Sequence, residues 1–380
     1  MAAVATVQSY NHAWRKSVAQ TPNCVREYNG TAFMVSVGFH AAPPLDSVEW
    51  ERLQHRIKTD ATHGVMLPEV KPLQCNETFR LAMPTDHVRA IAKRASLAFG
   101  FLLRDAEPYL ERNLMALADL CGDFATCWLF FVENDSRDRT RLLLQRRMAV
   151  APSAGTPLLR GSFLTNISRA YSVALCPPGL LQRNCAARVQ LLGFLRQRVL
   201  NLAWEQSGWD ALVMLDFDFV TFASGDFLQM FALGVRLNAS AIVGVSMYRN
   251  KLGHCTQYDR SLLGSNFKSL TRTMVHQGCM GTLLSGHGGF PVFFAQALRS
   301  AEPRPGYANQ KLFKLTAGGG YNDLVPFNLA LGKHGRAVGM PFLVDPRFRP
   351  LYTYGEGDLY LKNVSLALAM MSESSSTSPR

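Results

Sequence analysis

Residues 211–218 read Ala-Leu-Val-Met-Leu-Asp-Phe-Asp, and this stretch sets the architecture expected of the chain. An unbroken apolar run of this length is typical of a strand that is buried on both faces. Such strands belong to parallel sheets that helices cover on both sides. Because ligands bind beyond the carboxyl ends of the strands in these sheets, Asp216 and Asp218 follow the run at the position expected of a ligand site.

Similar apolar runs alternate with helical patterns along the chain, and the spacing of the apolar residues distinguishes strands from helices. We expect strands at Leu97–Leu103, Cys127–Val132, Leu158–Leu164, Ala211–Leu215 and Ala241–Val245. We expect helices at Glu107–Leu120, Thr140–Met148, Ala187–Trp204, Asp226–Leu233 and Leu324–Leu331. This alternation predicts an α/β fold with a mostly parallel, doubly wound sheet flanked by helices.

Polar clusters stand where several of the predicted strands end. Arg104 and Asp105 follow the first strand, Glu133 to Asp138 follow the second, and Asp216 and Asp218 follow a later one. Since parallel strands bring their carboxyl ends to one edge, we expect these clusters to meet there and form a site.

Asp216 and Asp218 are candidate ligands of a divalent cation. Two carboxylates two residues apart on an extended backbone point the same way and can approach one Mg²⁺ or Mn²⁺ ion. Such an ion would neutralise a diphosphate as it departs. The alternative is that one or both aspartates only cap the turn that follows.

The polar turn Glu133-Asn134-Asp135-Ser136-Arg137-Asp138 has two interpretations. Ser136 or Asp138 would cap the following helix, or the first acidic residues would bind the base and ribose of a nucleotide. The sequence leaves both open.

The two motifs together resemble those of a known family. Glu133-Asn134-x-Ser136-x-Asp138-x-Thr140 resembles a turn of glycosyltransferases with the GT-A fold, and Asp216-x-Asp218 resembles their metal motif. The pattern is most similar to the fungal capsule-type α-1,3-mannosyltransferases and related eukaryotic and viral enzymes. The resemblance covers residues 95–350 through short motifs, and Leu324 and Val199 depart from it where a His and an Asn are often found.

The resemblance implies a set of site residues. It implies donor binding by Arg104, Glu133, Asn134, Ser136, Asp138, Arg198 and Asp216, metal binding by Asp216 and Asp218, and an acceptor-side loop with His287, Gly288 and Gly289. Asp323 is the candidate general base if the enzyme inverts configuration, and Asp259 is a second candidate catalytic residue on the acceptor side. For each of these a structural role, such as a helix cap or a turn, stays open.

The expected function is metal-assisted transfer of a hexose, with mannose the first candidate, from a GDP- or UDP-sugar to a glycan or other hydroxyl acceptor. Two alternatives remain. Residues 215–220 also fit the motif of haloacid-dehalogenase-type Mg²⁺-dependent phosphatases, with Asp216 as nucleophile, although that motif normally lies on the first strand of its domain. The chain could also be a non-catalytic scaffold that binds nucleotide sugars.

The composition limits the partners and the domain plan. The 380 residues carry 40 Lys and Arg against 28 Asp and Glu, but no basic run interleaved with aromatics indicates nucleic-acid binding. We expect an irregular N-terminal extension (1–94), a catalytic domain (95–365) and a disordered tail (366–380). No apolar stretch is long enough for a membrane span.

The compartment stays open between the secretory or Golgi lumen, for a trimmed lumenal piece, and the cytoplasm. Six Asn-x-Ser/Thr sequons and eight cysteines point to the lumen, and Cys176 with Cys185 is the easiest disulfide to imagine.

Overall fold

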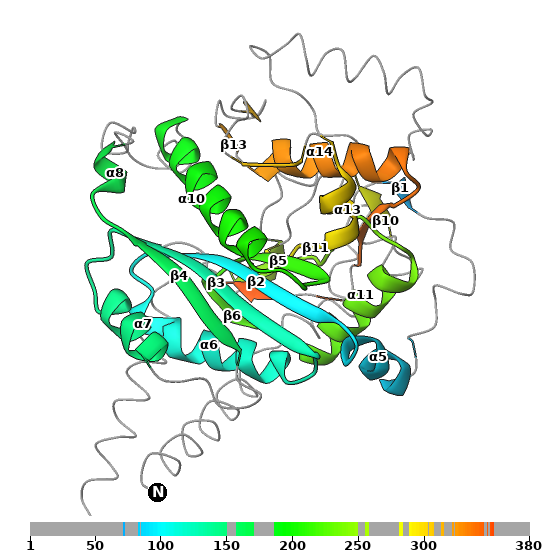
Figure 1. Ribbon diagram of the computed structural model, residues 1–380, viewed down its shortest axis with the longest axis horizontal. Coiled ribbons are helices and arrows are strands. Elements are labelled where there is room, and N and C mark those ends of the chain that lie inside the picture. Colours follow the sequence, from blue (N-terminus) through cyan, green and yellow to red (C-terminus); the bar gives the residue numbers. More distant parts are fainter. Residues whose placement is uncertain are drawn as a thin grey trace, which may run out of the picture.

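The structure, a computed structural model, describes residues 71–72, 83, 85–149, 157–170, 186–249, 255–257, 281–283, 289–302, 304–307, 313–314, 321–322, 324–345, 348 and 350–352. These residues form a central nine-stranded sheet with helices on both faces (Figure 1). The predicted tail at 366–380 and most of the predicted extension at 1–94 lie outside the described residues.

One half of the sheet is parallel and holds the strands with the longest apolar runs. It contains β2 (Ser96–Leu103), β3 (Thr126–Asn134), β4 (Leu158–Leu164) and β5 (Ala211–Asp216) in the order β5-β2-β3-β4. The register pairs Leu102 with Asp216 and Leu103 with Glu133, so three strands end at nearly the same level.

The other half of the sheet is mixed. It adds β11 (Val292–Phe294), β7 (Ala241–Val243), β14 (Phe342–Val344), β10 (Gly281–Leu283) and β1 (Lys71–Pro72), in that order outward from β5. β10 and β11 are antiparallel to both of their neighbours, so the remaining seven strands share one direction. This confirms the mostly parallel sheet predicted from the sequence.

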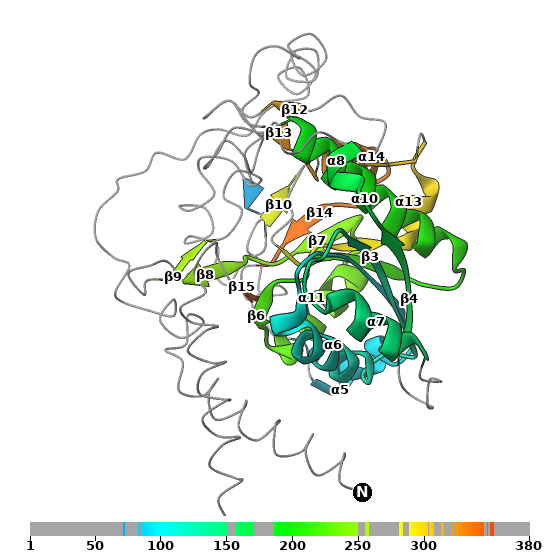
Figure 2. The ribbon, with the colours of Figure 1, turned by 90° about the vertical axis from the view of Figure 1, so that its left-hand side faces the viewer.

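Two smaller sheets lie beside the main one. The first has the order β6-β15-β8-β9 and lies to one side in Figure 2. Its strands are β6 (Phe219–Thr221), β15 (Leu351–Tyr352), β8 (Met247–Arg249) and β9 (Cys255–Gln257). The second pairs β12 (Phe313–Lys314) with β13 (Tyr321–Asn322). Because β6 begins three residues after β5 ends, the turn that carries Asp218 joins the main sheet to the first of these.

Helices cover the two faces of the main sheet and create two apolar cores. α5 (Thr85–Ala92), α6 (Glu107–Cys121), α7 (Thr140–Ala149) and α11 (Ser224–Arg236) cover one face. α10 (Ala186–Glu205), α13 (Ala295–Ser300) and α14 (Leu324–Ala337) cover the other, and the short α8 (Ile167–Ala170) follows β4. Along β2, Leu97, Phe99 and Phe101 face the first core and Ala98 faces the second, as the two-residue period of a strand requires.

The segment expected to be an irregular extension contains regular structure near its end. Helix α5 packs against α11, and β1 pairs with β10 at the edge of the main sheet. Regular elements therefore occur in part of this segment, and the division into an extension, a catalytic domain and a tail stays a prediction.

A disulfide joins Cys121 at the end of α6 to Cys127 in β3. The expected pair Cys176 and Cys185 lies outside the described residues. Among the helices that the structure describes, none is both long enough and apolar enough to cross a membrane.

Candidate functional site

The polar clusters at the ends of β5, β2 and β3 meet at one edge of the sheet. Asp216 is paired in register with Leu102, and Leu103 is paired with Glu133. Neighbouring strands lie about 4.8 Å apart. The main chains of Asp216 and Glu133, which lie on either side of β2, are therefore about 10 Å apart. The convergence predicted from the strand ends is thus present in the fold.

Asp216 is the last residue of β5, and Asp218 lies in the turn that leads to β6. The Arg196 guanidinium forms an ion pair with Asp216 at 3.3 Å, between Nη2 and Oδ1. The side chain of Arg196 is only 8% exposed and that of Asp216 is 23% exposed. Asp218 is partly buried, so both carboxylates border solvent without lying in the core.

The arginine that pairs with Asp216 is Arg196, whereas the sequence prediction assigned Arg198 to the phosphate oxygens of the donor. Arg198 is exposed, and it lies two residues further along α10, which is about 200° around the helix axis. Arg196 and Arg198 therefore lie on different sides of the helix, and the predicted contact of Arg198 with the donor stays a prediction. The helical period could have identified Arg196, because it lies four residues after Leu192 and three before Val199 on the predicted apolar stripe.

Glu133 is the penultimate residue of β3 and supports the polar turn that follows the strand. It is fully buried, its Oε1 accepts the amide of Ser136 at 2.9 Å, and its Oε2 accepts Arg141 Nε at 2.6 Å. Arg141 also donates to the carbonyl of Leu164, which joins the turn to the end of β4. With both carboxylate oxygens engaged, Glu133 supports the turn. Asn134 is 4% exposed, and the predicted contacts of Glu133 and Asn134 with a nucleotide stay predictions.

Asp138 caps the starts of two helices. Its Oδ1 accepts the Thr140 amide at 3.0 Å, at the start of α7, and its Oδ2 accepts the Glu107 amide at 2.9 Å, at the start of α6. Burial alone would raise the pKa of Asp138, but the hydrogen bonds from Thr140 and Glu107 outweigh it and hold the pKa below its ordinary value. The helix-capping interpretation of Asp138 is thus confirmed.

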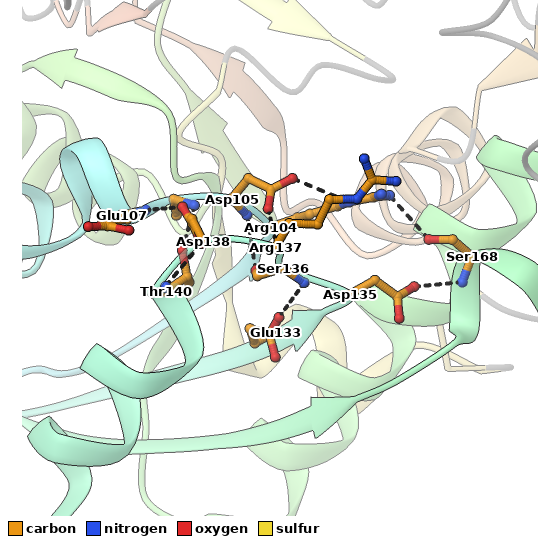
Figure 3. Close-up of polar contacts among 11 residues, drawn as sticks. Arg104, Asp105, Glu107, Glu133, Asp135, Ser136, Arg137, Asp138, Thr140 and Ser168 are labelled. Atoms are coloured by element: carbon orange, nitrogen blue, oxygen red, sulfur yellow. Dashed lines mark hydrogen bonds and ion pairs between the residues drawn. The ribbon is translucent and has the colours of Figure 1, made fainter.

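Further side chains lock the turn after β2 to the turn after β3 (Figure 3). Ser136 Oγ accepts the Asp105 amide at 3.0 Å, and Asp105 Oδ1 accepts the Arg137 amide at 2.7 Å. Asp105 and Asp135 both have positive φ, at 50° and 52°, a conformation that aspartate tolerates better than most residues. The turns therefore form one rigid unit.

This unit extends to the start of α8. Asp135 accepts the Ser168 amide at 2.8 Å, and Arg104 Nη1 donates to Ser168 Oγ at 3.1 Å. Arg104 is exposed, so its guanidinium borders the same edge of the sheet and can reach an anion there.

Tyr109 connects the turn after β3 with the acidic pair. Burial raises the pKa of its phenol, and the carboxylates of Asp218, Asp138 and Asp105 raise the pKa further. The carboxylate of Asp218 and those of Asp105 and Asp138 at the polar turn therefore act on the same hydroxyl group. The ring also packs near Phe217, with centroids 6.3 Å apart. No motif in the sequence identified this tyrosine.

Gly289 is the described part of the predicted acceptor-side loop. Its carbonyl accepts the Asp216 amide at 3.2 Å and the Tyr352 hydroxyl at 2.6 Å. With φ at 71° and the Tyr352 ring 2.5 Å from the position of a Cβ, only glycine fits. The resemblance therefore pointed to a residue beside Asp216. His287, Gly288, Asp259 and Asp323 lie outside the described residues.

The acidic pair fits a hard divalent cation. Mg²⁺ is usually held by one or two carboxylates together with phosphate oxygens and water, and Asp216 and Asp218 supply oxygen ligands of this kind. Among the described residues no group of three His, Cys, Asp or Glu side chains could hold an ion by itself. Asp216 and Asp218 would supply two of the ligands of an ion bound here.

Two hollows border the described residues. One of about 530 Å³ lies on the outer side of the polar turn and is lined by Ser136, Asp138 and Arg141 among others, without Asp216 or Asp218. A larger one of about 860 Å³ lies at the opposite end of the strands, beside Ala95 and Asp210, and includes none of the predicted site residues. The site therefore rests on the convergence of strand ends, and neither hollow defines it.

No protein-family model matches the chain, and no curated protein matches its sequence. Similar solved structures include a mycobacterial protein, with 10% identity, coverage of 73% of this chain and 74% of that one, and a TM-score of 0.36. The mannosyltransferase PcManGT from Pyrobaculum calidifontis, in complex with GDP-Man and Mn²⁺, has 13% identity, coverage of 69% and 58%, and a TM-score of 0.41.

S. aureus TarS, residues 1–349 in complex with UDP-GlcNAc, has 13% identity, coverage of 69% of this chain and 59% of that one, and a TM-score of 0.39. The chain thus spans less than two thirds of the length of the PcManGT and TarS structures. A likeness of this degree carries no weight for the activity or the ligands of this chain.

Proposed function

We propose that this chain is a glycosyltransferase that moves a hexose from a nucleoside-diphosphate sugar to a hydroxyl group of a glycan, with Mn²⁺ or Mg²⁺. One observation carries the proposal. Asp216 and Asp218 follow a central parallel strand and lie at the same edge as the rigid turn that contains Ser136 and Asp138. This is the edge at which α/β sheets bind their ligands.

The roles of the residues follow from their chemistry. Asp218, together with Asp216, would hold the cation, which supplies charge neutralisation for the departing diphosphate. Arg196 orients Asp216 through their ion pair, and the exposed Arg104 would pair with phosphate oxygens. The polar turn would present Ser136 to the nucleoside, while Glu133 braces the turn from inside.

The acceptor side rests on the resemblance stated above. Asp323 is proposed as the general base that takes the proton of the acceptor hydroxyl, with Asp259, His287 and Gly288 near the acceptor. GDP-mannose is the first donor to test, followed by UDP-hexoses. The disulfide between Cys121 and Cys127 supports an oxidising compartment, and we propose the secretory lumen on that basis.

The phosphatase alternative is less well supported. It requires Asp216 to act as a nucleophile, but Arg196 pairs with its Oδ1 and would make that oxygen less nucleophilic. Asp216 also ends β5, which follows three parallel strands of the same sheet along the chain, whereas the phosphatase motif normally lies on the first strand.

A donor screen tests the proposal. GDP-mannose and UDP-hexoses are incubated with the protein and either MnCl₂ or EDTA, and release of nucleoside diphosphate is measured. We expect one donor to be hydrolysed with Mn²⁺ and not with EDTA. Asp218→Ala should abolish this activity while its unfolding transition stays close to that of the wild type, since Asp218 lies in a turn at the end of a strand.

Two outcomes would contradict the proposal. One is metal-dependent turnover that survives in Asp218→Ala, and the other is hydrolysis of p-nitrophenyl phosphate without turnover of any nucleotide sugar. Asp323→Asn adds a test of the base, because it should lower turnover of an acceptor more than it weakens binding of the donor.

A further inference from the structure

The turn that carries Asp218 is held from α6 by one buried side chain. Asn113 is fully buried, and its Nδ2 donates to the carbonyl of Phe217 at 2.6 Å and to the carbonyl of Phe219 at 3.0 Å. These residues stand immediately before and after Asp218. Both amide hydrogens of a single side chain are thus directed at the main chain that flanks one carboxylate.

Arg112 fixes the orientation of Asn113. Its Nε donates to Asn113 Oδ1 at 2.8 Å, and its Nη2 donates to the carbonyl of Phe219 at 2.8 Å. The acceptor of the Asn113 amide is therefore used by Arg112 and its donors are used by the turn. A rotated amide would place two donors against Arg112 and an acceptor against two carbonyls, so only one orientation is compatible with this arrangement.

The surroundings of Asn113 are otherwise apolar. The neighbouring Phe217 stacks on Phe101 with ring centroids 4.5 Å apart, and Phe219 packs against Phe290 with centroids 5.3 Å apart. Leu110 and Leu114 of α6 belong to the same core. A leucine at 113 would suit such packing, whereas a buried amide requires every polar group to be satisfied. The hydrogen bonds of Asn113 therefore fix the conformation of the turn at Asp218, which apolar packing by a leucine would not specify.

We propose that Asn113, oriented by Arg112, is a positioning residue that sets the direction of the Asp218 carboxylate toward the cation. This rests on the proposed function. The Phe217 carbonyl belongs to the peptide that leads into Asp218, and the Phe219 carbonyl belongs to the peptide that leaves the next residue, so Asn113 restrains the main chain before and after Asp218. Groups that orient metal ligands in this way typically change metal affinity by about 10- to 100-fold when they are removed.

The test measures binding of Mn²⁺ alone to the full chain, by isothermal titration and by the electron paramagnetic resonance signal of free Mn²⁺. Asn113→Leu, which has nearly the same size, should raise the dissociation constant about 10- to 100-fold while the protein keeps a cooperative unfolding transition. The Mn²⁺ concentration that half-activates donor hydrolysis should rise in parallel.

Gln229 supplies a matched control. Its side chain also makes two hydrogen bonds to main chain, accepting the Met83 amide at 3.1 Å and donating to the Met83 carbonyl at 2.8 Å, but it does not contact the Asp218 turn. Gln229→Leu should therefore lower stability and leave Mn²⁺ affinity unchanged. Affinity losses of equal size in the two variants would overturn the inference, because they would report general loosening of the fold.

Arg112→Ala keeps the test decisive if Asn113→Leu does not fold. Arg112 is only partly buried, and its removal leaves the Asn113 amide free to rotate, so Mn²⁺ affinity should fall in the same direction by a smaller factor. Unchanged affinity in every folded variant at 112 and 113 would overturn the positioning role while the proposed function stood. A wild-type protein that binds Mn²⁺ neither alone nor together with GDP or UDP would overturn the proposed function and this inference with it.

Discussion

The Asp138 carboxylate shows how one residue can build the site and stabilise the fold together. It accepts an amide from the first turn of α6 and another from the first turn of α7. The N-terminus of each helix carries a partial positive charge, so the Asp138 carboxylate interacts favourably with both helix dipoles. The residue that the family resemblance assigns to the donor is therefore also a structural cap, and the two roles are compatible because Asp138 remains partly exposed.

Replacing Asp138 should separate its capping role from its charge. Asp138→Ala removes both caps, and at about 1 kcal/mol per cap the free energy of unfolding should fall by about 2 kcal/mol. Asp138→Asn keeps one acceptor oxygen and should lose less. Urea unfolding at pH 7 measures both variants, and equal stability of Asp138→Ala and the wild type would contradict the capping role.

The charge of Asp138 predicts a pH dependence with a definite sign. Its pKa in the folded protein is lowered, so its contribution to stability is present above the unfolded pKa of about 3.9 and is lost as the pH falls through the folded pKa. The difference in stability between the wild type and Asp138→Asn should therefore shrink as the pH falls below about 5. A difference that is constant with pH would show that the charge contributes nothing.

At the scale of elements, the site depends on how closely α10 approaches the sheet. A Cβ at Gly100 in β2 would lie 2.6 Å from Val199 Cγ1 of α10 and 3.2 Å from Met214 Sδ of β5. Glycine thus lets the helix pack directly on the strands. Because α10 carries Arg196, this close contact also sets the distance between Arg196 and Asp216.

Gly100→Ala should force α10 and β2 apart. We expect overpacking to lower the free energy of unfolding by about 1–3 kcal/mol. Gly225→Ala is the control, because a Cβ there meets nothing within 4 Å and alanine is the better helix former, which should raise stability by about 0.5–1 kcal/mol in α11. Denaturant unfolding of both variants measures the effects, and a stable Gly100→Ala would argue against the close contact.

Many elements were predictable from the sequence, because β2, β3 and β5 contain continuous apolar runs and the helices carry apolar residues at the helical period. The predicted strand at Leu158–Leu164 has its predicted bounds, and the predicted helix at 187–204 differs from α10 by one residue at each end. The directions of the strands in the mixed half of the main sheet were not predictable from the sequence. β11 is three residues long and runs against β5 and β7, and a residue period does not encode the direction of a strand.

The location of the candidate site was predictable from the sequence, but the contacts of its individual residues were less predictable. Strand ends and parallel direction bring Asp216 near the polar turn, which the sequence indicated. The orientation of each side chain depends on tertiary packing, so Glu133 was expected to face a ligand but is paired internally with Arg141. Arg198 follows from the family resemblance, whereas the helical period places Arg196 on the apolar stripe of α10, where it pairs with Asp216.

At the scale of the whole molecule, two apolar cores on opposite faces of one sheet hold the candidate ligands rigidly at its edge. The carboxylates of Asp216 and Asp218 come from one strand end, the polar turn from another, and Asn113 and Arg196 reach them from opposite layers. A site assembled in this way should bind a cation and a nucleoside diphosphate as a linked pair, since each would supply ligands that the other lacks.

The most direct test of this account is the linkage between Mn²⁺ and a nucleoside diphosphate, measured by isothermal titration of GDP and UDP with and without MnCl₂. We expect one of them to bind at least about tenfold more tightly with Mn²⁺, within the range of typical coupling energies, and Asp218→Ala to lose that gain. Equal affinity with and without Mn²⁺ for both nucleotides, or an undiminished gain in Asp218→Ala, would contradict it.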